Sequence, residues 1–263
     1  MKMDKYTHGT FSWIDLAALD LDGAKAFYSE LFGWSAQDVP APNGSTYTMF
    51  LKDGDTVAAA YSLPEEMRAP GVPAFWCNYV SVDEIGPVLA RAEAAGGQVK
   101  MPACEIGSSG QMAALTDPSG APVFLWQPGE HIGATRVNEP GCLTWNELAT
   151  RDVPGSLEFY NKVFGWTAEV EEGPMAYTTV KNGERANGGV ISIDPSWGEV
   201  PPHWVPYICV ENCEESVARA EAMGAKIVVP TMEAEGVGFF AQILDPQGAH
   251  FALMQMHPGA ADE

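Results

Sequence analysis

Alternating apolar and polar residues mark a strand near the start of the chain. Residues 11–17 read Phe-Ser-Trp-Ile-Asp-Leu-Ala, and side chains two positions apart share one face of a strand. We therefore expect Ile14 and Leu16 on one face of this strand. The opposite face is expected to carry four residues: Phe11, Trp13, Asp15 and Ala17.

A helical period follows this strand. Phe27 and Leu31 stand four positions apart within residues 22–32, as on the buried face of a helix, and Gly33 suits the left-handed residue that ends one. The same order then returns. We expect a second set of elements: strands at 46–52, 56–63 and 75–82, a helix at 84–95, and strands at 112–116 and 122–127 around an Asp-Pro-Ser-Gly turn.

Much of this pattern occurs a second time in the chain. Residues 9–34 and 141–166 are identical at 11 of 26 aligned positions, including Phe-Tyr and Phe-Gly-Trp. An Ala-Arg-Ala-Glu-Ala block and an Asp-Pro-x-Gly-Ala block also recur further along, in the same order. Because the order is kept, the sequence indicates a duplicated domain rather than a short solenoid repeat. We place the domains at residues 1–130 and 141–263, joined by a linker at residues 131–140.

The recurring residues resemble a known superfamily. A first strand, then Asp-x-x-Gly-x-x-x-Phe-Tyr-x-x-x-Phe-Gly-Trp, with Asp-Pro-x-Gly before the last strand, is similar to the vicinal oxygen chelate superfamily of glyoxalases, bleomycin-resistance proteins and extradiol dioxygenases. The resemblance covers nearly the whole chain, twice. It implies an α+β fold of two tandem glyoxalase-like domains, each built of two βαβββ units that form a U-shaped sheet around a cleft.

One branch of the superfamily shows further likeness. Gln-Pro at 127–128, His-Ile-Gly-Ala-Thr at 131–135 and Trp-Asn-Glu-Leu at 145–148 resemble the tandem-domain branch labelled hydroxylase or glyoxalase-like antigen. That branch includes the anthracycline-binding accessory protein of doxorubicin biosynthesis. The resemblance therefore raises antibiotic biosynthesis as a setting for this chain.

The superfamily's metal site does not match this sequence. In the family a metal in the cleft, held by His, Glu or Gln, chelates neighbouring substrate oxygens. The positions that the resemblance assigns to its ligands carry other residues: Trp13, Cys77 and Phe124 in the first domain, and Trp145, Val205 and Ala252 in the second. A single thiolate would not hold a metal. We therefore expect no metal and no cofactor.

A shift of two residues in the alignment with the family would change which residues stand at the ligand positions. It would bring Asp15 and Glu147, or His203 and His250, to the ligand positions. Taken singly, each histidine is more simply explained as a solvated or locally bonded side chain.

Aromatic and sulfur-bearing side chains are expected to line both clefts. The candidate ligand-binding residues are Trp13, Asp15, Cys77, Phe124 and Trp126 in the first domain, and Trp145, Glu147, His203, Tyr207, His250 and Met254 in the second. Flat apolar ligands stack well on tryptophan faces. Alternatively, the large side chains only fill a closed cleft. Ala149, Val205 and Ala252 should leave the second cleft roomier.

Asp15 and Glu147 are equivalent carboxylates of the two copies. Each is a candidate partner for an amine of the ligand, and a weak candidate for a catalytic base, because burial raises the pKa of a carboxyl. The alternative is that each is tied to a neighbouring arginine or backbone amide. The sequence leaves both possibilities open.

Composition limits the partners of the chain. Its formal net charge of −21 argues against nucleic acid and anionic membranes, both of which require clustered lysine and arginine. The N-terminus has no signal-like apolar segment, and no apolar run approaches the roughly 18 residues of a membrane span. Five cysteines without a Cys-x-x-Cys pair indicate reduced thiols and a cytoplasmic protein.

These features favour a binding protein over an enzyme. We expect metal-independent binding of a flat aromatic, cationic or neutral, small molecule such as an antibiotic or polyketide, for sequestration or as an accessory to a biosynthetic oxygenase. The alternative is a glyoxalase- or dioxygenase-like enzyme acting on a small oxygenated metabolite. A third hypothesis is a metal-free enzyme using Asp15 or Glu147 as its base. The sequence allows a monomer or a homodimer.

Overall fold

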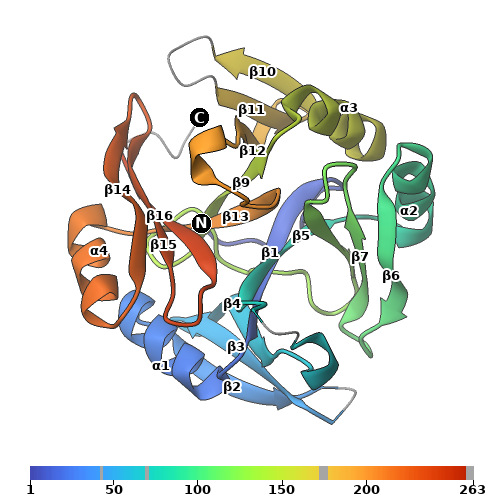
Figure 1. Cartoon of the computed structure of the whole chain (residues 1–263). Coiled ribbons are helices and arrows are strands. Elements are labelled where there is room, and N and C mark those ends of the chain that lie inside the picture. The colour runs from blue at the N-terminus through green and yellow to red at the C-terminus, as the bar shows by residue number, and fades with distance from the viewer. Residues whose placement is uncertain (42–43, 69–70, 172–176, 259–263) are drawn as a thin grey trace.

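The computed structural model describes residues 1–41, 44–68, 71–171 and 177–258. These residues form two eight-stranded mixed sheets (Figure 1). The first sheet has the order β2-β3-β4-β1-β5-β8-β7-β6. Its strands are β1 (Thr10–Ala18), β2 (Ser35–Pro40), β3 (Thr46–Lys52), β4 (Asp55–Ser62), β5 (Phe75–Ser81), β6 (Gln98–Glu105), β7 (Gly110–Thr116) and β8 (Pro122–Pro128).

The second sheet repeats the first in its topology. Its order is β10-β11-β12-β9-β13-β16-β15-β14, so each strand occupies the same place in this sheet as its duplicate does in the first sheet. The strands are β9 (Leu143–Thr150), β10 (Thr167–Glu171), β11 (Tyr177–Asn182), β12 (Arg185–Ser192), β13 (His203–Cys209), β14 (Lys226–Ala234), β15 (Gly238–Leu244) and β16 (His250–Met256). The predicted α+β architecture of two tandem domains with the same topology is therefore confirmed.

Within the described ranges, four α-helices connect the strands. They are α1 (Leu21–Phe32), α2 (Ile85–Ala94), α3 (Val153–Phe164) and α4 (Cys213–Ala222), with short 3-10 turns η1 (Glu65–Met67) and η2 (Pro195–Trp197). Asp20 caps α1 by accepting from the Gly23 amide at 3.1 Å, and Gly33 ends it at φ 69°. Asp152 and Gly165 do the same for α3. The duplicated Asp-x-x-Gly and Phe-Gly-Trp blocks thus encode where α1 and α3 begin and end.

The outer strand of each half-sheet is not apparent from the pattern of the sequence. Strands β2, β6, β10 and β14 lie at the sheet edges, and β2 is almost entirely exposed. An edge strand buries neither face deeply, so polar residues replace the apolar alternation.

One predicted side-chain direction is wrong. Phe11 does not share a face with Trp13, because the pairing of β1 with β5 shifts register between these two residues. The extra residue turns Phe11 to the opposite face. There it packs on Trp166 and Trp204 of the other domain, with ring centroids 5.5 and 4.9 Å away.

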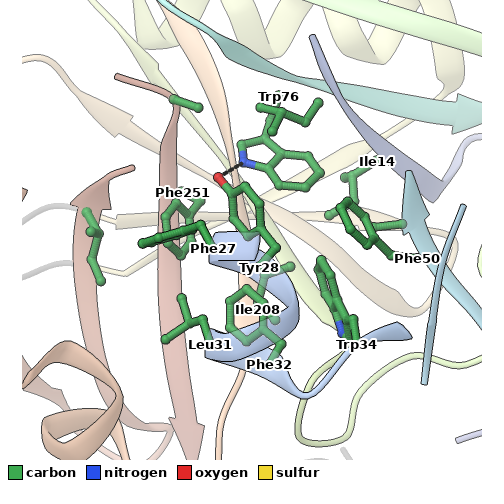
Figure 2. Close-up of a cluster of buried hydrophobic side chains, with 14 of the residues drawn as sticks. Ile14, Phe27, Tyr28, Leu31, Phe32, Trp34, Phe50, Trp76, Ile208 and Phe251 are labelled. Carbon is green, nitrogen blue, oxygen red and sulfur yellow. Dashed lines mark hydrogen bonds between the residues drawn. The ribbon is translucent and has the colours of Figure 1, made fainter. Parts of the chain in front are cut away.

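Each domain buries its helices against the other domain. Helix α1 lies beside α4, and α3 beside α2 (Figure 1). Figure 2 shows the first of these junctions, where Tyr28 of α1 sits among aromatic rings and Trp76 Nε1 donates to its hydroxyl at 3.1 Å. The Tyr28 hydroxyl in turn donates to Asp245 at 2.9 Å. The Phe-Tyr block of one copy is therefore bonded to the Asp-Pro-x-Gly turn of the other.

The second junction repeats this arrangement. Trp204 Nε1 donates to the Tyr160 hydroxyl at 2.8 Å, and Tyr160 interacts with Asp117. The helices and the apolar faces turned toward them account for the two largest buried clusters. The remaining face of each sheet, turned away from the helices, is called its inner face below.

Within the described part of the chain, none of the helices is both long and apolar enough to cross a membrane.

Candidate functional site

The inner face of the first sheet gathers most of the residues predicted for the first cleft. Trp13, Cys77, Phe124 and Trp126 share one apolar cluster there, together with Tyr79. They come from β1, β5 and β8, which are neighbours in the sheet. The alternation predicted these positions correctly from Trp13 onward.

A polar network crosses this first inner face. The carboxylate of Asp15 accepts from the Tyr47 hydroxyl at 2.9 Å and from the Tyr79 hydroxyl at 3.1 Å. Trp13 Nε1 donates to the same Tyr47 hydroxyl at 3.1 Å. Burial raises the pKa of Asp15 to about 6, although the two tyrosines and Cys77 oppose the shift by hydrogen bonding.

The chain itself covers the first inner face. The linker places His131 against Trp13 and Trp126, with ring centroids 4.6 and 5.6 Å away, and Trp126 Nε1 donates to the His131 carbonyl at 2.8 Å. Tyr6 of the N-terminal segment donates to the Ala134 carbonyl at 2.7 Å. As a result Trp13 is only 3% exposed. Here the alternative of a filled cleft describes the structure well.

The turn before β7 helps to hold this covering. The amides of Gly129 and His131 both donate to the Ser109 carbonyl, at 2.8 and 3.1 Å, and the Glu130 amide donates to the Ser108 carbonyl at 2.9 Å. The glycine-containing segment at residues 107–110 therefore anchors the linker.

The second inner face carries a duplicate of the polar network. Trp145 Nε1 donates to the Tyr177 hydroxyl at 2.8 Å, and the Tyr207 hydroxyl donates to Glu147 at 2.8 Å. Gln242 Nε2 also donates to Glu147, at 3.2 Å. Burial raises the pKa of Glu147 to about 7 against the hydrogen bonds of Tyr207, Tyr177 and Gln242.

Smaller residues surround this second network. Ala252 stands where the first sheet has Phe124, because both pair with equivalent positions of the preceding strand: Gln242 and Ala114. Gly189 pairs with Glu147 as Ala59 pairs with Asp15. A Cβ at Gly189 would lie 1.9 Å from the Tyr177 hydroxyl. Trp145 remains half-buried, in contrast to Trp13.

Two histidines meet on the second inner face. His203 opens β13 and His250 opens β16, and each lies two residues before an inner-face residue, Val205 and Ala252 respectively. His203 Nε2 and His250 Nδ1 are 2.9 Å apart, and His203 Nδ1 is 2.8 Å from the Pro201 carbonyl. Burial lowers the pKa of both rings, that of His250 to about 3 with a contribution from His203.

The donor set does not fit the metal that the fold implies. The positions assigned to its ligands carry Trp, Cys or Val, and Phe or Ala, and the described residues contain no group of three or more His, Cys, Asp or Glu side chains that could hold an ion. The two histidine nitrogens face each other rather than a common centre. Glu147 is engaged by its tyrosine and glutamine donors.

The structure thus brings the predicted residues together on two faces. Met254 joins Val205, Tyr207 and Ala252 in the second apolar cluster, beside Trp145. That any of these residues binds a ligand, or that Asp15 or Glu147 acts as a base, stays a prediction.

Sequence reasoning missed several members of the networks. They are Tyr47, Tyr79, Tyr177 and Gln242, and the covering residue His131. A signal for Tyr47 and Tyr177 exists, since both precede a threonine at matching places of the repeat.

Comparison with known proteins agrees with this architecture. Over 262 residues the chain is 40% identical to "Putative glyoxylase CFP32" of Mycobacterium tuberculosis, covering 98% of each chain. It is 31% identical over 281 residues to "Anthracycline biosynthesis protein DauV" of Streptomyces sp., covering 99% of each. Among solved structures, the Mn(II)-bound glyoxalase from Novosphingobium aromaticivorans matches with a TM-score of 0.67 at 14% identity, covering 94% of this chain and 82% of that one. The model of the Glyoxalase/Bleomycin resistance protein/Dioxygenase superfamily matches residues 10–124 and 142–253, so the chain belongs to this superfamily.

Proposed function

We propose that the protein binds a flat aromatic small molecule on the inner face of its C-terminal domain without a metal ion. The observation that carries this proposal is the difference between two duplicated faces. The first is covered by the linker and filled by Phe124 and Trp126, whereas the second has Ala252 and Met254 at these positions. A small inner-face residue, Ala252, beside the half-buried indole of Trp145 suits a planar ligand that stacks on the indole.

The chemistry of the second face supports binding over turnover. Glu147 receives hydrogen bonds from Tyr207 and Gln242, so one of its carboxylate oxygens already has partners within the protein. The metal ligands that glyoxalase or dioxygenase chemistry would use are replaced. The anthracycline biosynthesis proteins among the relatives are consistent with a polycyclic aromatic ligand. Our proposal places the protein in the cytoplasm, as a sequestering or accessory protein; a biosynthetic oxygenase as partner stays a prediction.

Tryptophan fluorescence provides the test. Anthraquinones and anthracyclines should quench the emission of the natural chain at micromolar concentration. Trp145→Phe should reduce both the affinity and the quenching, because the stacking surface at the second face shrinks. Trp13→Phe is the matched control, since Trp13 lies under the linker, and should leave the affinity unchanged. Absence of quenching across the panel, or equal effects of both substitutions, would contradict the proposal.

Elemental analysis separates the proposal from the enzymatic alternative. Protein purified without chelators should contain no stoichiometric Fe, Ni, Mn or Zn. A stoichiometric metal that is lost together with ligand binding in the Glu147→Gln or His250→Phe variant would favour the metal-dependent enzyme instead.

A further inference from the structure

The two histidines of the second inner face are linked in a row of hydrogen bonds that begins at the Pro201 carbonyl. This carbonyl determines where the protons of both rings lie. A backbone carbonyl can only accept, so His203 Nδ1, at 2.8 Å from the Pro201 carbonyl, must carry a proton. In a neutral ring the other nitrogen, His203 Nε2, is then an acceptor. His250 Nδ1, 2.9 Å away, must therefore donate to it.

The far nitrogen of the histidine pair, His250 Nε2, is an acceptor. With Nδ1 protonated, a neutral His250 has a lone pair on Nε2. This nitrogen is buried and has no hydrogen-bond partner among the residues that the structure describes. The lowered pKa of both rings keeps them neutral, so the assignment holds at physiological pH. A buried acceptor without a partner is costly and is usually satisfied by a bound group.

His250 Nε2 lies at the face proposed to bind the ligand, and the fold does not require it. His203 pairs across the sheet with Ala149, and the next inner-face pair is Val205 with Glu147. Ala149 therefore neighbours His203 and Val205 neighbours Glu147, so small side chains flank both the histidine pair and the Glu147 network. The first domain has Phe75 and Pro122 at the positions of His203 and His250. Its fold forms without the histidines.

We propose that His250 Nε2 accepts a hydrogen bond from a hydroxyl group of the aromatic ligand, so that the second face selects phenolic over O-alkylated aromatic compounds. This inference rests on the proposed function and adds the ligand class to it. His250 is the binding residue. His203 is a positioning residue, which holds the lone pair of His250 toward the ligand through the bond to Nδ1.

Calorimetric titration with 2-hydroxyanthraquinone and 2-methoxyanthraquinone tests the selection. The natural chain should bind the hydroxyl compound roughly tenfold to a hundredfold more tightly, because the methyl ether leaves the acceptor unpaired. His250→Phe keeps a planar ring but removes the acceptor, and should bind both compounds alike. A preference that survives in His250→Phe, or equal binding by the natural chain, would overturn the inference while leaving the proposed function intact. If neither compound bound the natural chain, both would fail.

The positioning role has its own readout. Imidazole nitrogen chemical shifts of the labelled protein should assign His250 as the Nδ1–H tautomer, with the Nε2 signal shifting when the hydroxyl compound binds. His203→Gln, whose amide oxygen can accept from His250, should keep most of the selectivity, whereas His203→Phe should lose it. A proton found on His250 Nε2 in the free protein would overturn the inference without any ligand.

Discussion

Trp13 and Trp145 stand at equivalent places in the two domains, and each donates to a tyrosine of an equivalent polar network. Their surroundings differ. Trp13 lies under the linker and against His131, whereas Trp145 remains half-buried beside alanine and valine. Duplication has thus kept one network for folding in both copies. Only the second copy combines it with small neighbours and a histidine pair.

Hydrogen bonds among tryptophan, tyrosine and a buried carboxylate occur in two kinds of place in the molecule. The Trp76–Tyr28–Asp245 contacts join the domains, and the Trp145–Tyr177 and Tyr207–Glu147 contacts hold an inner face. A buried carboxylate that accepts from tyrosine hydroxyls is stabilising only while all its partners stay in place. A change at one face can therefore be compared with a matched change at the other.

The largest expected effect comes from making the second face resemble the first. Ala252→Phe with Gln242→Ala recreates the Phe124 and Ala114 pair of the first sheet. The new ring should occupy the floor and weaken aromatic ligand binding at least about a hundredfold, the loss expected when a ring fills a stacking site. Titration by fluorescence measures this.

The reciprocal change is the control for that swap. Phe124→Ala should cost about 2–4 kcal/mol of unfolding free energy through the cavity it leaves, with ligand affinity unchanged. Full affinity in the Ala252→Phe, Gln242→Ala variant would show that the ligand lies elsewhere.

The second prediction concerns pH. The folded state raises the pKa of Glu147 from 4.5 to about 7, so the unfolded chain releases this proton first. The contribution of Glu147 to stability is therefore fully present below pH 4.5 and is lost as pH rises toward 7, by on the order of 3 kcal/mol. Glu147→Gln has no proton to release. The difference in unfolding free energy between the two proteins should change across this window.

The first face supplies the matched measurement. Asp15→Asn should show the same behaviour between pH 3.8 and about 6, the values of its unfolded and folded pKa. Stability curves of natural and substituted chains that run parallel in these windows would refute the assignment of buried, raised-pKa carboxyls.

The third prediction has the opposite sign. Burial lowers the pKa of His131 from 6.5 to about 4, so the folded chain resists its protonation and loses stability as pH falls from 6.5 toward 4. Allowing for partial exposure, we expect about 1–3 kcal/mol. His131→Phe keeps a ring between Trp13 and Trp126 and removes the titration. Chemical unfolding at several pH values measures the difference in unfolding free energy between the two proteins, which should change between pH 6.5 and 4 and stay constant above pH 6.5.

The smallest effect is expected at Gly189. A methyl group there would meet the Tyr177 hydroxyl at 1.9 Å, and moving this ring weakens its contacts with Trp145 and Glu147. Gly189→Ala should cost about 1–3 kcal/mol, in the range of overpacking substitutions. Thermal unfolding measures this cost. Ala59→Gly is the counterpart in the first sheet, and a loss in Gly189→Ala no larger than in Ala59→Gly would argue against a special role for this glycine.

Local patterns in the sequence predicted the parts of the fold that depend on neighbours along the chain. The capping aspartates and the ending glycines of α1 and α3 lie within one turn of the residues they serve. Alternation also placed Trp13, Asp15, Cys77 and Tyr207 on inner faces. Phe11 is the exception. A register shift in the pairing of β1 with β5 turns its side chain to the opposite face of the sheet, and that pairing is not visible in the local sequence pattern.

The candidate site depended on contacts between distant segments. Tyr47 reaches Asp15 from β3, Tyr177 reaches Trp145 from β11, and His131 reaches Trp13 from the linker. None of these approaches follows from the spacing of residues. His203 and His250 carry no signal of a site when taken singly, and they come together only because β13 and β16 are parallel neighbours in the sheet.

The stoichiometry of ligand binding tests the central claim most directly. Calorimetric titration of the natural chain with a hydroxylated anthraquinone should give one bound molecule per chain, and the Ala252→Phe, Gln242→Ala variant should give none. Two molecules per chain would mean that the covered first face binds as well. One molecule that persists in the variant would show that the second inner face is not the binding site.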